Sequence, residues 1–406
     1  MKAELVDRHE GRHRLRTASL TTLAAACGLF GWGYGINSIA AFVVPIWFLS
    51  QSRLHAWLAM FVYFLAASRT IPFSSAVFFE EGSSPVLGVF LWVGSAAILA
   101  APWAIFRPAA SSARRIAHLV VAIIVSVVPP VGLIGWTNPI LGAALVVPGG
   151  GWVSLGIGFA LLAACAWVDR RHPLRSLAAP ATVVLLASIT HLHTELAPPP
   201  KHWVGATMHA GQAPTGAIQQ AERQLAVIAA IDDGLAKNAR VIVLPEQILG
   251  TWSATWHLFL EASIGAQLRE HKAQVLLGAA VPISSSERTF NSAIVYDGTS
   301  WRQANARFAI PVSMWKPWSA QSTVVEWFAD GTYWIDERKI LLSLCYEDLL
   351  VWPALLSFIH KPQLIVSMAN AWWAGTGPKI LDIQREHIEA WARIFNVPIV
   401  RAVNAP

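Results

Sequence analysis

The sequence predicts a multi-pass α-helical membrane domain followed by an α/β domain, because charge and hydrophobicity divide the chain in two. Residues 17–190 contain eight Lys or Arg and three Asp or Glu, whereas residues 191–406 contain 17 and 18. Charged residues make up 13% of the chain, against about 25% in a typical soluble domain. Long apolar runs fill the first segment, and strand-like runs alternate with helical ones in the second. We expect a membrane domain at 1–190, a linker at 191–202 and a globular domain at 203–406.

Seven apolar runs in the first segment predict about seven transmembrane helices. A helix needs about 20 residues to cross the hydrocarbon layer of a membrane. Pro148 and three glycines interrupt the sixth run, so we expect that crossing at about 152–168. The runs lie at 17–35, 37–50, 54–68, 85–106, 116–136, 139–168 and 174–190.

Basic residues in alternate loops predict the orientation of these crossings. Arginines precede the first run and lie between runs two and three, four and five, and six and seven: Arg8, Arg12, Arg14, Arg16, Arg53, Arg107, Arg114, Arg115, Arg170, Arg171 and Arg175. Lys and Arg mark the cytoplasmic side of a membrane protein. We therefore expect an N-terminus in the cytoplasm, and a C-terminal domain on the periplasmic side of a bacterial inner membrane.

Composition also limits the partners and cofactors. The 17 basic and 18 acidic residues of 191–406 sum to −1, which argues against a nucleic-acid partner, since such a domain needs a basic face. The three cysteines are far apart in sequence and predict neither a disulfide framework nor a zinc site. We expect no metal and no cofactor. Twelve tryptophans follow residue 200, and Trp favours the membrane interface, which suggests membrane lipid as a partner.

In the second segment, alternating elements predict α/β layers. Three prolines at 198–200 predict a stiff, extended spacer before the first strand. We expect helices at 215–238 and 381–394, and strands at 203–208, 241–244, 275–280, 292–296, 340–344, 364–368 and 398–402.

Three of these strands end in polar residues, and functional side chains of α/β folds lie where strands end. Glu246 follows the second strand, Cys345 with two carboxylates follows the fifth, and Asn370 follows the sixth. A thiol becomes a strong nucleophile when a nearby base removes its proton. The alternative for Cys345 alone is a small buried hydrophobic residue, and for Glu246 a carboxylate at a helix start.

Four motifs together resemble the carbon–nitrogen hydrolase (nitrilase) superfamily: Leu244-Pro245-Glu246, Phe290-Asn291-Ser292-Ala293, Leu344-Cys345-Tyr346-Glu347 and Asn370-Ala371-Trp372. With an apolar first half, the whole chain resembles apolipoprotein N-acyltransferases. The segment from Ile310 to Trp318 is similar to the nitrilase-like TraB conjugal transfer proteins. The resemblance implies an α/β/β/α sandwich with a Glu–Lys–Cys triad. It makes Glu246 the base, Cys345 the nucleophile and Glu347 a further acid, with Tyr346, Glu347, Asn370 and Trp372 as substrate-binding positions.

The chain departs from the family pattern where the lysine should be. Aligned on Pro311, Ala306 occupies the lysine position, and Met314 replaces a family acid. The basic residues of this segment are Arg307 and Lys316. We expect one of them, with Arg307 first, to lie within about 4 Å of Glu246 or Cys345 as an ion partner. Arg307 could stabilise an oxyanion but could not act as an acid or base.

Three functions remain open at this stage. The resemblance implies an acyltransferase, in which the cysteine takes an acyl chain from a phospholipid as a thioester and passes it to a lipoprotein's amino group. The alternatives are a non-catalytic assembly factor, which would contact proteins of a conjugation machinery through a degenerate nitrilase domain, and a membrane-anchored amidase. An apolipoprotein N-acyltransferase proper is a further reading of the first function.

Overall fold

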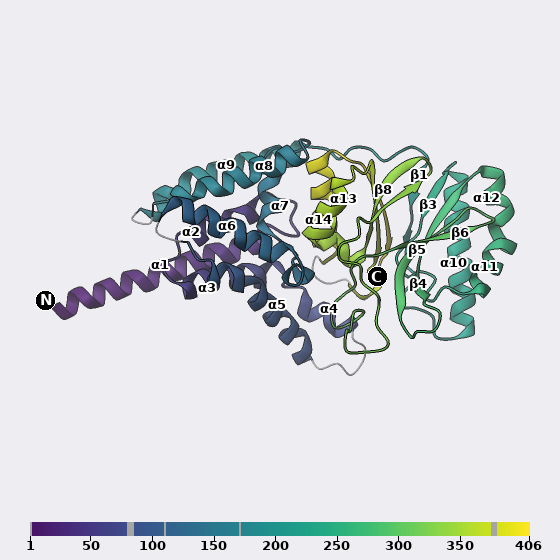
Figure 1. The fold of residues 1–406 in the computed structure, drawn as a ribbon, viewed down its shortest axis with the longest axis horizontal. Coiled ribbons are helices and arrows are strands. Elements are labelled where there is room, and N and C mark those ends of the chain that lie inside the picture. Colours follow the sequence, from purple (N-terminus) through teal and green to yellow (C-terminus); the bar gives the residue numbers. More distant parts are fainter. Residues whose placement is uncertain (1, 79–84, 109–110, 170–171, 375–379) are drawn as a thin grey trace. The chain divides into compact units, whose positions relative to one another are not determined.

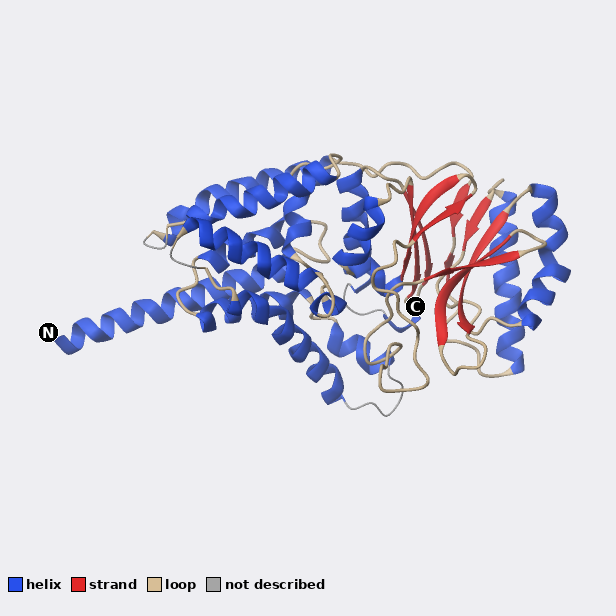
Figure 2. Cartoon of the chain, viewed as in Figure 1, coloured by secondary structure: helices blue, strands red, loops and turns tan. Residues whose placement is uncertain are grey.

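The chain folds into two compact units in a computed structural model, which describes residues 2–78, 85–108, 111–169, 172–374 and 380–406. The main segment of the first unit ends at Glu195 and that of the second begins at Leu196. The first unit is helical, whereas the second contains two β-sheets and the helices that cover them (Figures 1 and 2). Of the basic loop residues, Arg170 and Arg171 lie outside the described part of the chain.

The helical unit packs through its apolar side chains and through a few buried polar contacts. Helix α1 packs against α3, and α3 against α5. The indole of Trp32 donates to the Tyr63 hydroxyl at 3.0 Å, and that hydroxyl donates to the Thr137 carbonyl at 2.8 Å. The helices are α1 (Lys2–Phe30), α2 (Val43–Phe48), α3 (Arg53–Ala67), α4 (Ile71–Phe78), α5 (Pro85–Ile105), α6 (Ser112–Val127), α7 (Pro139–Ala144), α8 (Trp152–Ala164) and α9 (Pro173–His193).

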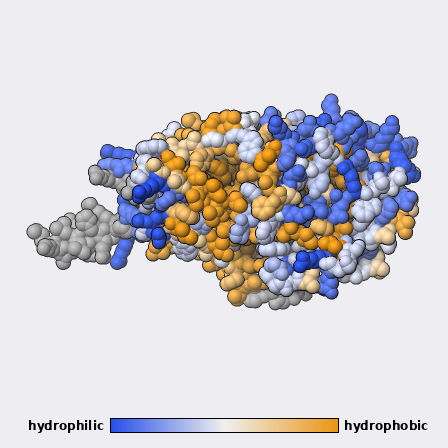
Figure 3. Space-filling model, viewed as in Figure 1, coloured by the Kyte–Doolittle hydropathy of each residue, from blue (hydrophilic) through white to orange (hydrophobic). Residues whose placement is uncertain are grey.

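Many large apolar side chains of this unit face outward. Phe90 is 70% exposed and Leu185 is 61% exposed, and hydrophobic residues gather over the helical unit in Figure 3. One described helix, Val86–Ile105, is long and apolar enough to cross a membrane. Shorter apolar helices lie at Asn37–Phe48, Arg53–Ala67, Trp152–Trp167 and Arg175–Thr190. The expectation of seven crossings therefore stays a prediction.

The second unit contains two five-stranded sheets. The first has the strand order β1-β3-β4-β5-β6, and the second β2-β10-β9-β8-β7. The strand expected at 203–208 is in fact two strands that join different sheets, since β1 pairs with β3 and β2 with β10. The strands are β1 (Trp203–Gly205), β2 (Thr207–Met208), β3 (Val241–Val243), β4 (Gln274–Pro282), β5 (Thr289–Tyr296), β6 (Trp301–Asn305), β7 (Thr332–Ile335), β8 (Arg338–Leu344), β9 (Leu364–Asn370) and β10 (Ile399–Asn404).

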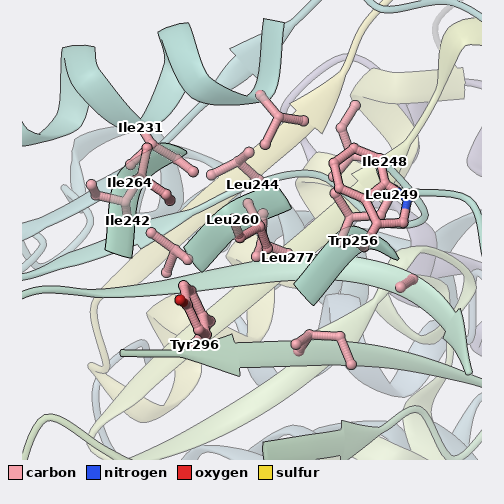
Figure 4. Packing of buried hydrophobic residues seen from close by; sticks show 14 of the residues in the cluster. Ile231, Ile242, Leu244, Ile248, Leu249, Trp256, Leu260, Ile264, Leu277 and Tyr296 are labelled. Atoms are coloured by element: carbon pink, nitrogen blue, oxygen red, sulfur yellow. The ribbon is translucent and has the colours of Figure 1, made fainter. Parts of the chain in front are cut away.

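The two sheets face each other and helices cover their outer faces, so the expected α/β/β/α sandwich is confirmed. Val243 and Leu276 of the first sheet lie in one buried cluster with Leu342 and Val366 of the second. A second buried cluster lies between the first sheet and helices α10 (Ala217–Ala236), α11 (Ala254–Leu260) and α12 (Ala266–His271) (Figure 4). Helix α13 (Val351–Ile359) packs on β8, and its Phe358 stacks on Trp391 of α14 (Ile380–Phe395).

This architecture places one polar turn at the end of a strand in each sheet. Glu246 follows β3 in the first sheet, and Cys345 directly follows β8 in the second. A glycine allows the Glu246 turn to lie tightly against its own sheet, because a Cβ at Gly278 of β4 would collide with the backbone of Pro245 and Glu246. Close backbone packing within the first sheet therefore fixes the position of the Glu246 turn.

Candidate active site

Cys345 lies at a sharp turn between β8 and a 3₁₀ helix, η5 (Cys345–Leu349). Its φ is +48°, in the left-handed region that costs a non-glycine residue about 1 kcal/mol or more. The Gln384 side chain donates to the Cys345 carbonyl at 2.7 Å, and the thiol faces the Asn370 carbonyl at 3.9 Å. Strained turns of this kind cluster at functional sites, and this one is held by partners from α14 and β9.

Glu246 faces this thiol from the other sheet. Its carboxylate accepts a hydrogen bond of 2.6 Å from the Asn291 amide of β5 and hydrogen-bonds with the Cys345 thiol. Burial raises the pKa of Glu246 to about 7, although the two hydrogen bonds oppose that rise. A carboxylate with a pKa near neutrality is suited to general base catalysis.

The thiol itself is held in its neutral form. Burial raises the pKa of Cys345 well above its ordinary value, and the charge of Glu246 raises it further. Only 6% of Cys345 and 5% of Glu246 is exposed. Before any reaction the pair is therefore a neutral thiol beside a carboxylate that can accept its proton. A nearby positive charge is needed to make this proton transfer favourable.

Arg307, the first candidate for that charge, pairs instead with Glu347. The guanidinium Nε lies 3.2 Å from Glu347 Oε1, and both side chains are almost completely buried. Its remaining described bonds go to the carbonyls of Asp330, Pro353 and Leu342 and to the Ser357 hydroxyl. A Cβ at Gly331 would collide with this guanidinium. Among the described residues, no ion pair joins Arg307 to Glu246.

Glu347 consequently has a structural position behind the nucleophile. Its Oε1 accepts from the backbone amides of Arg307 and Phe308 at 2.7 and 3.1 Å, and its Oε2 accepts from the Leu344 amide at 3.2 Å. Arg307 follows β6 of the first sheet, whereas Glu347 follows β8 of the second. The pair therefore ties the Cys345 turn to the opposite sheet.

Lys316, the second candidate, lies half-buried in the loop between β6 and β7. Its backbone amide donates to the Ser322 hydroxyl at 2.9 Å, and no described ion pair places its ammonium group on Glu246. The described contacts of Arg307 and Lys316 therefore place neither of these expected cations beside Glu246 and Cys345.

The other predicted positions surround the pair to different degrees. The Asn370 side chain accepts a bond of 2.9 Å from Asn404 of β10, and its carbonyl faces the thiol and also accepts from the Trp373 indole at 2.7 Å. Tyr346 is buried, which raises the pKa of its phenol. Trp372 is half-buried in a short 3₁₀ helix, η6 (Trp372–Ala374). Asn370 and Tyr346 thus adjoin the nucleophile, whereas no described contact places Trp372 on it.

Ala306 occupies the place from which a lysine side chain would reach this pair. Ser292 of β5 pairs with Asn305 of β6, and the Ala306 amide donates to the Asn291 carbonyl at 2.8 Å, so Ala306 lies opposite Asn291. Directly opposed residues on antiparallel strands project to the same face. The Asn291 Oδ1 is buried and accepts no described hydrogen bond. The Glu246 carboxylate and the Asn291 Oδ1 therefore receive no hydrogen bond from position 306.

Comparison with known proteins identifies the family. A conjugal transfer protein TraB of Agrobacterium fabrum is 31% identical to this chain over 420 residues, which cover 97% of this chain and 94% of the relative. The chain belongs to the TraB family of conjugal transfer proteins. A probable conjugal transfer protein TraB of Sinorhizobium fredii is 30% identical over 403 residues, covering 97% and 99%.

No family model matches this TraB-family chain. A solved mutant of an amidase from Nesterenkonia AN1, of the nitrilase superfamily, is 12% identical, with a TM-score of 0.36 over 51% of this chain and 79% of that chain.

Sequence reasoning on this TraB-family chain noted the carboxylate of Asp348 after Cys345 but assigned it no role, and it missed Arg401. Asp348 is completely buried, and its carboxylate accepts from the hydroxyls of Ser343 and Ser367 at 2.5 and 2.8 Å. Burial raises the pKa of Asp348 to about 6, and the charge of Arg401 opposes that rise. A charged residue inside the apolar strand 398–402 was the signal that could have revealed Arg401. No group of three or more His, Cys, Asp or Glu among the described residues is arranged to hold a metal ion.

Replacing Arg307 with methionine should destabilise the fold rather than slow the chemistry alone. Removing one partner of a buried ion pair leaves the other charge unpaired, which costs about 3–5 kcal/mol. We expect Arg307→Met to lower the melting temperature of the detergent-solubilised chain and its level in cells. Arg302→Met, on the exposed side of β6, is the matched control and should behave as the unaltered protein. An Arg307→Met protein with an unchanged melting temperature and an unreactive Cys345 would instead assign Arg307 to the chemistry.

Placing a lysine at position 306 should activate Cys345. The ammonium group would face the Glu246 carboxylate and the Asn291 Oδ1, which accepts no described hydrogen bond, and would favour the thiolate. Because one stabilising donor contributes about 10²–10³ in rate at such sites, we expect Ala306→Lys to raise the alkylation rate of Cys345 at pH 7 at least tenfold. Ala306→Met has similar length without charge and should not do so. Equal rates in the two variants would contradict the predicted position of the side chain.

Proposed function

We propose that this protein is a membrane-bound acyl-transfer or amidase protein that acts in conjugal plasmid transfer, with Cys345 as nucleophile and Glu246 as base. The observation that carries the proposal is the buried hydrogen-bonded pair of Cys345 and Glu246, contributed by the two sheets. A strained turn holds the thiol, and burial brings the pKa of Glu246 to about 7. The names of the two relatives support the role in conjugal transfer.

The proposed acyl transfer has two steps. Glu246 takes the thiol proton, and the sulfur attacks the carbonyl carbon of an acyl ester or amide. A C–S bond forms, the C–O or C–N bond breaks, and the leaving alcohol or amine takes the proton from Glu246. An amine or water then attacks the thioester and gives a proton to Glu246, the C–S bond breaks, and the departing thiolate recovers that proton.

Exposed apolar surface supports a membrane lipid as the acyl donor. In the α/β unit, Trp318 is 71% and Phe328 is 69% exposed, and both lie in the loop that joins β6 to β7. Aromatic side chains favour the membrane–water interface. The exposed apolar helices of the first unit and the alternation of basic loops support an inner-membrane location, with the α/β domain in the periplasm. The amino group that receives the acyl chain would then belong to a lipoprotein or another protein of the transfer machinery.

The second candidate function is a non-catalytic assembly factor. Ala306 favours it, because the buried pair of Glu246 and Cys345 receives no lysine from that position. Under this hypothesis the sandwich would serve as a folded contact surface for other proteins of the conjugation machinery, and Cys345 would contribute only packing.

Replacing Cys345 with alanine separates these functions. We expect plasmid transfer by Cys345→Ala to fall to the level of the gene deletion, and Glu246→Gln to lose about 10²–10⁴ in rate of thioester formation, since a general base contributes that much. The measurements are mating efficiency and capture of labelled acyl chains from phospholipid vesicles. Cys165→Ala, at a buried cysteine of the helical unit, is the control. If Cys345→Ala is present in the membrane fraction and transfers plasmid normally, the assembly-factor function is correct.

The Asn291 hydrogen bond should set the pH dependence of this chemistry. That bond stabilises the charged form of Glu246 and so lowers its pKa. Asn291→Leu keeps the size of the side chain but removes the donor, so the pKa of Glu246 should rise. The ascending limb of the pH–rate profile should then move from about 7 to higher pH. Ser292→Ala removes a neighbouring side chain that bonds to Asn305 instead and should leave the profile in place. An unchanged midpoint in Asn291→Leu would show that Glu246 is not the titrating base.

A further inference from the structure

A row of polar side chains crosses the second sheet beneath the nucleophile. Ser343 of β8 pairs in register with Ser367 of β9, and Ser367 pairs with Arg401 of β10. The strand neighbours Leu342, Val366 and Val400 lie in the buried cluster between the two sheets. Because side chains alternate along a strand, the polar row faces the other way, toward the covering helices.

Asp348 joins this row to the Cys345 turn. One of its oxygens accepts from Ser343, and the other accepts from Ser367 at 2.8 Å and from the Gln384 amide at 3.2 Å. The same Gln384 amide donates to the Cys345 carbonyl at 2.7 Å. The carboxylate is therefore tied both to the sheet and to the backbone of the nucleophile.

Arg401 is a half-buried arginine with no described hydrogen bond to a carboxylate. Its Nε and Nη2 are closed off from solvent and donate to no described atom, whereas Arg307 is paired with Glu347. Arg401 interacts electrostatically with Asp348 and with Cys345. It also faces Arg385 and Glu389 of α14, and those two opposite charges form an ion pair with each other at 3.9 Å.

The charges around the thiol show why a cation here matters. The charges of Glu246 and Asp348 both raise the pKa of Cys345 and so disfavour its ionisation. Glu347 is already compensated by Arg307, and the buried His387 of α14 is neutral because burial lowers its pKa to about 3. Among the described groups that act on Cys345, Arg401 is thus the positive charge left to balance a thiolate.

We infer that Arg401 is a positioning residue whose positive charge stabilises the Cys345 thiolate, in place of a lysine at position 306. Asp348 holds the polar row in register, and its negative charge limits the stabilisation of the thiolate by Arg401. This inference rests on the proposed function only in treating Cys345 as the nucleophile. The proton released by the thiol goes to Glu246, and Arg401 exchanges none.

The test is the pH profile of Cys345 alkylation by iodoacetamide, measured on the full chain in detergent. Peptide mass spectrometry separates Cys345 from Cys27 and Cys165. Arg401→Met, of similar length without charge, should move the midpoint at least one unit to higher pH, which lowers the rate about tenfold below the midpoint. Arg401→Lys keeps the charge and should stay within about threefold of the unaltered rate, as a purely structural role would not allow. Arg338→Met, at the exposed start of β8, is the matched control and should not shift the profile.

A second variant keeps the test decisive if Arg401→Met does not fold. Asp348→Asn removes a negative charge that opposes ionisation of the thiol, so its midpoint should move to lower pH. An unshifted midpoint in folded Arg401→Met, or a shift of Asp348→Asn to higher pH, would overturn the inference. Loss of plasmid transfer is scored separately with Cys345→Ala, so a non-catalytic protein would show normal transfer in that variant whatever the alkylation profile.

Discussion

The buried ion pair of Arg307 and Glu347 is the contact on which the geometry of the candidate site depends. It joins the end of β6 in one sheet to the turn after β8 in the other. The same carboxylate accepts from the Leu344 amide, one residue before the nucleophile. Moving either partner would leave a buried charge unpaired, which costs several kcal/mol. The pair therefore fixes the separation of the sheets at the point where Cys345 and Glu246 meet.

The same ion pair explains why the site has a shortage of positive charge. Four acidic or acid-forming groups, Glu246, Cys345, Glu347 and Asp348, are buried close to the strand ends. Arg307 neutralises one of them and is held by so many acceptors that it has no described donor left for the others. Burial raises the pKa of each of the remaining groups, which disfavours their charged forms. A cation from the second sheet, as we infer for Arg401, would therefore have a large effect on the charge balance of this site.

The strand ends could be predicted from the sequence, because apolar runs followed by polar residues mark the edge of an α/β sheet. This reasoning located Glu246 and Cys345, and the structure brings them together. It did not locate β6, β7 or the change of sheet between Gly205 and Thr207, since these strands are short and lack a continuous apolar run. Local patterns carry little information about such segments, whose pairing is decided by contacts distant in sequence.

The partner of Arg307 was beyond sequence reasoning for a similar reason. Glu347 lies 40 residues later, and only the folded sandwich brings the two together. Alignment suggested a cation that points at Glu246, because it treats neighbouring positions as equivalent. In a β-strand, however, a shift of one residue reverses the face to which a side chain points. Ala306 lies opposite Asn291 and projects to the catalytic face, so Arg307 could not take over the position of the lysine.

Conformational strain and buried titratable groups together favour a site that performs chemistry. Cys345 occupies a left-handed conformation, which a residue other than glycine adopts at a cost in free energy. The Glu246 carboxylate faces that thiol from the other sheet, and the polar row below it is buried at a cost in desolvation. Each of these features lowers the stability of the folded state, and all three lie around the Cys345 sulfur. These three features are the ones that the proposed nucleophile would need, because its thiol must be oriented, deprotonated and counterbalanced.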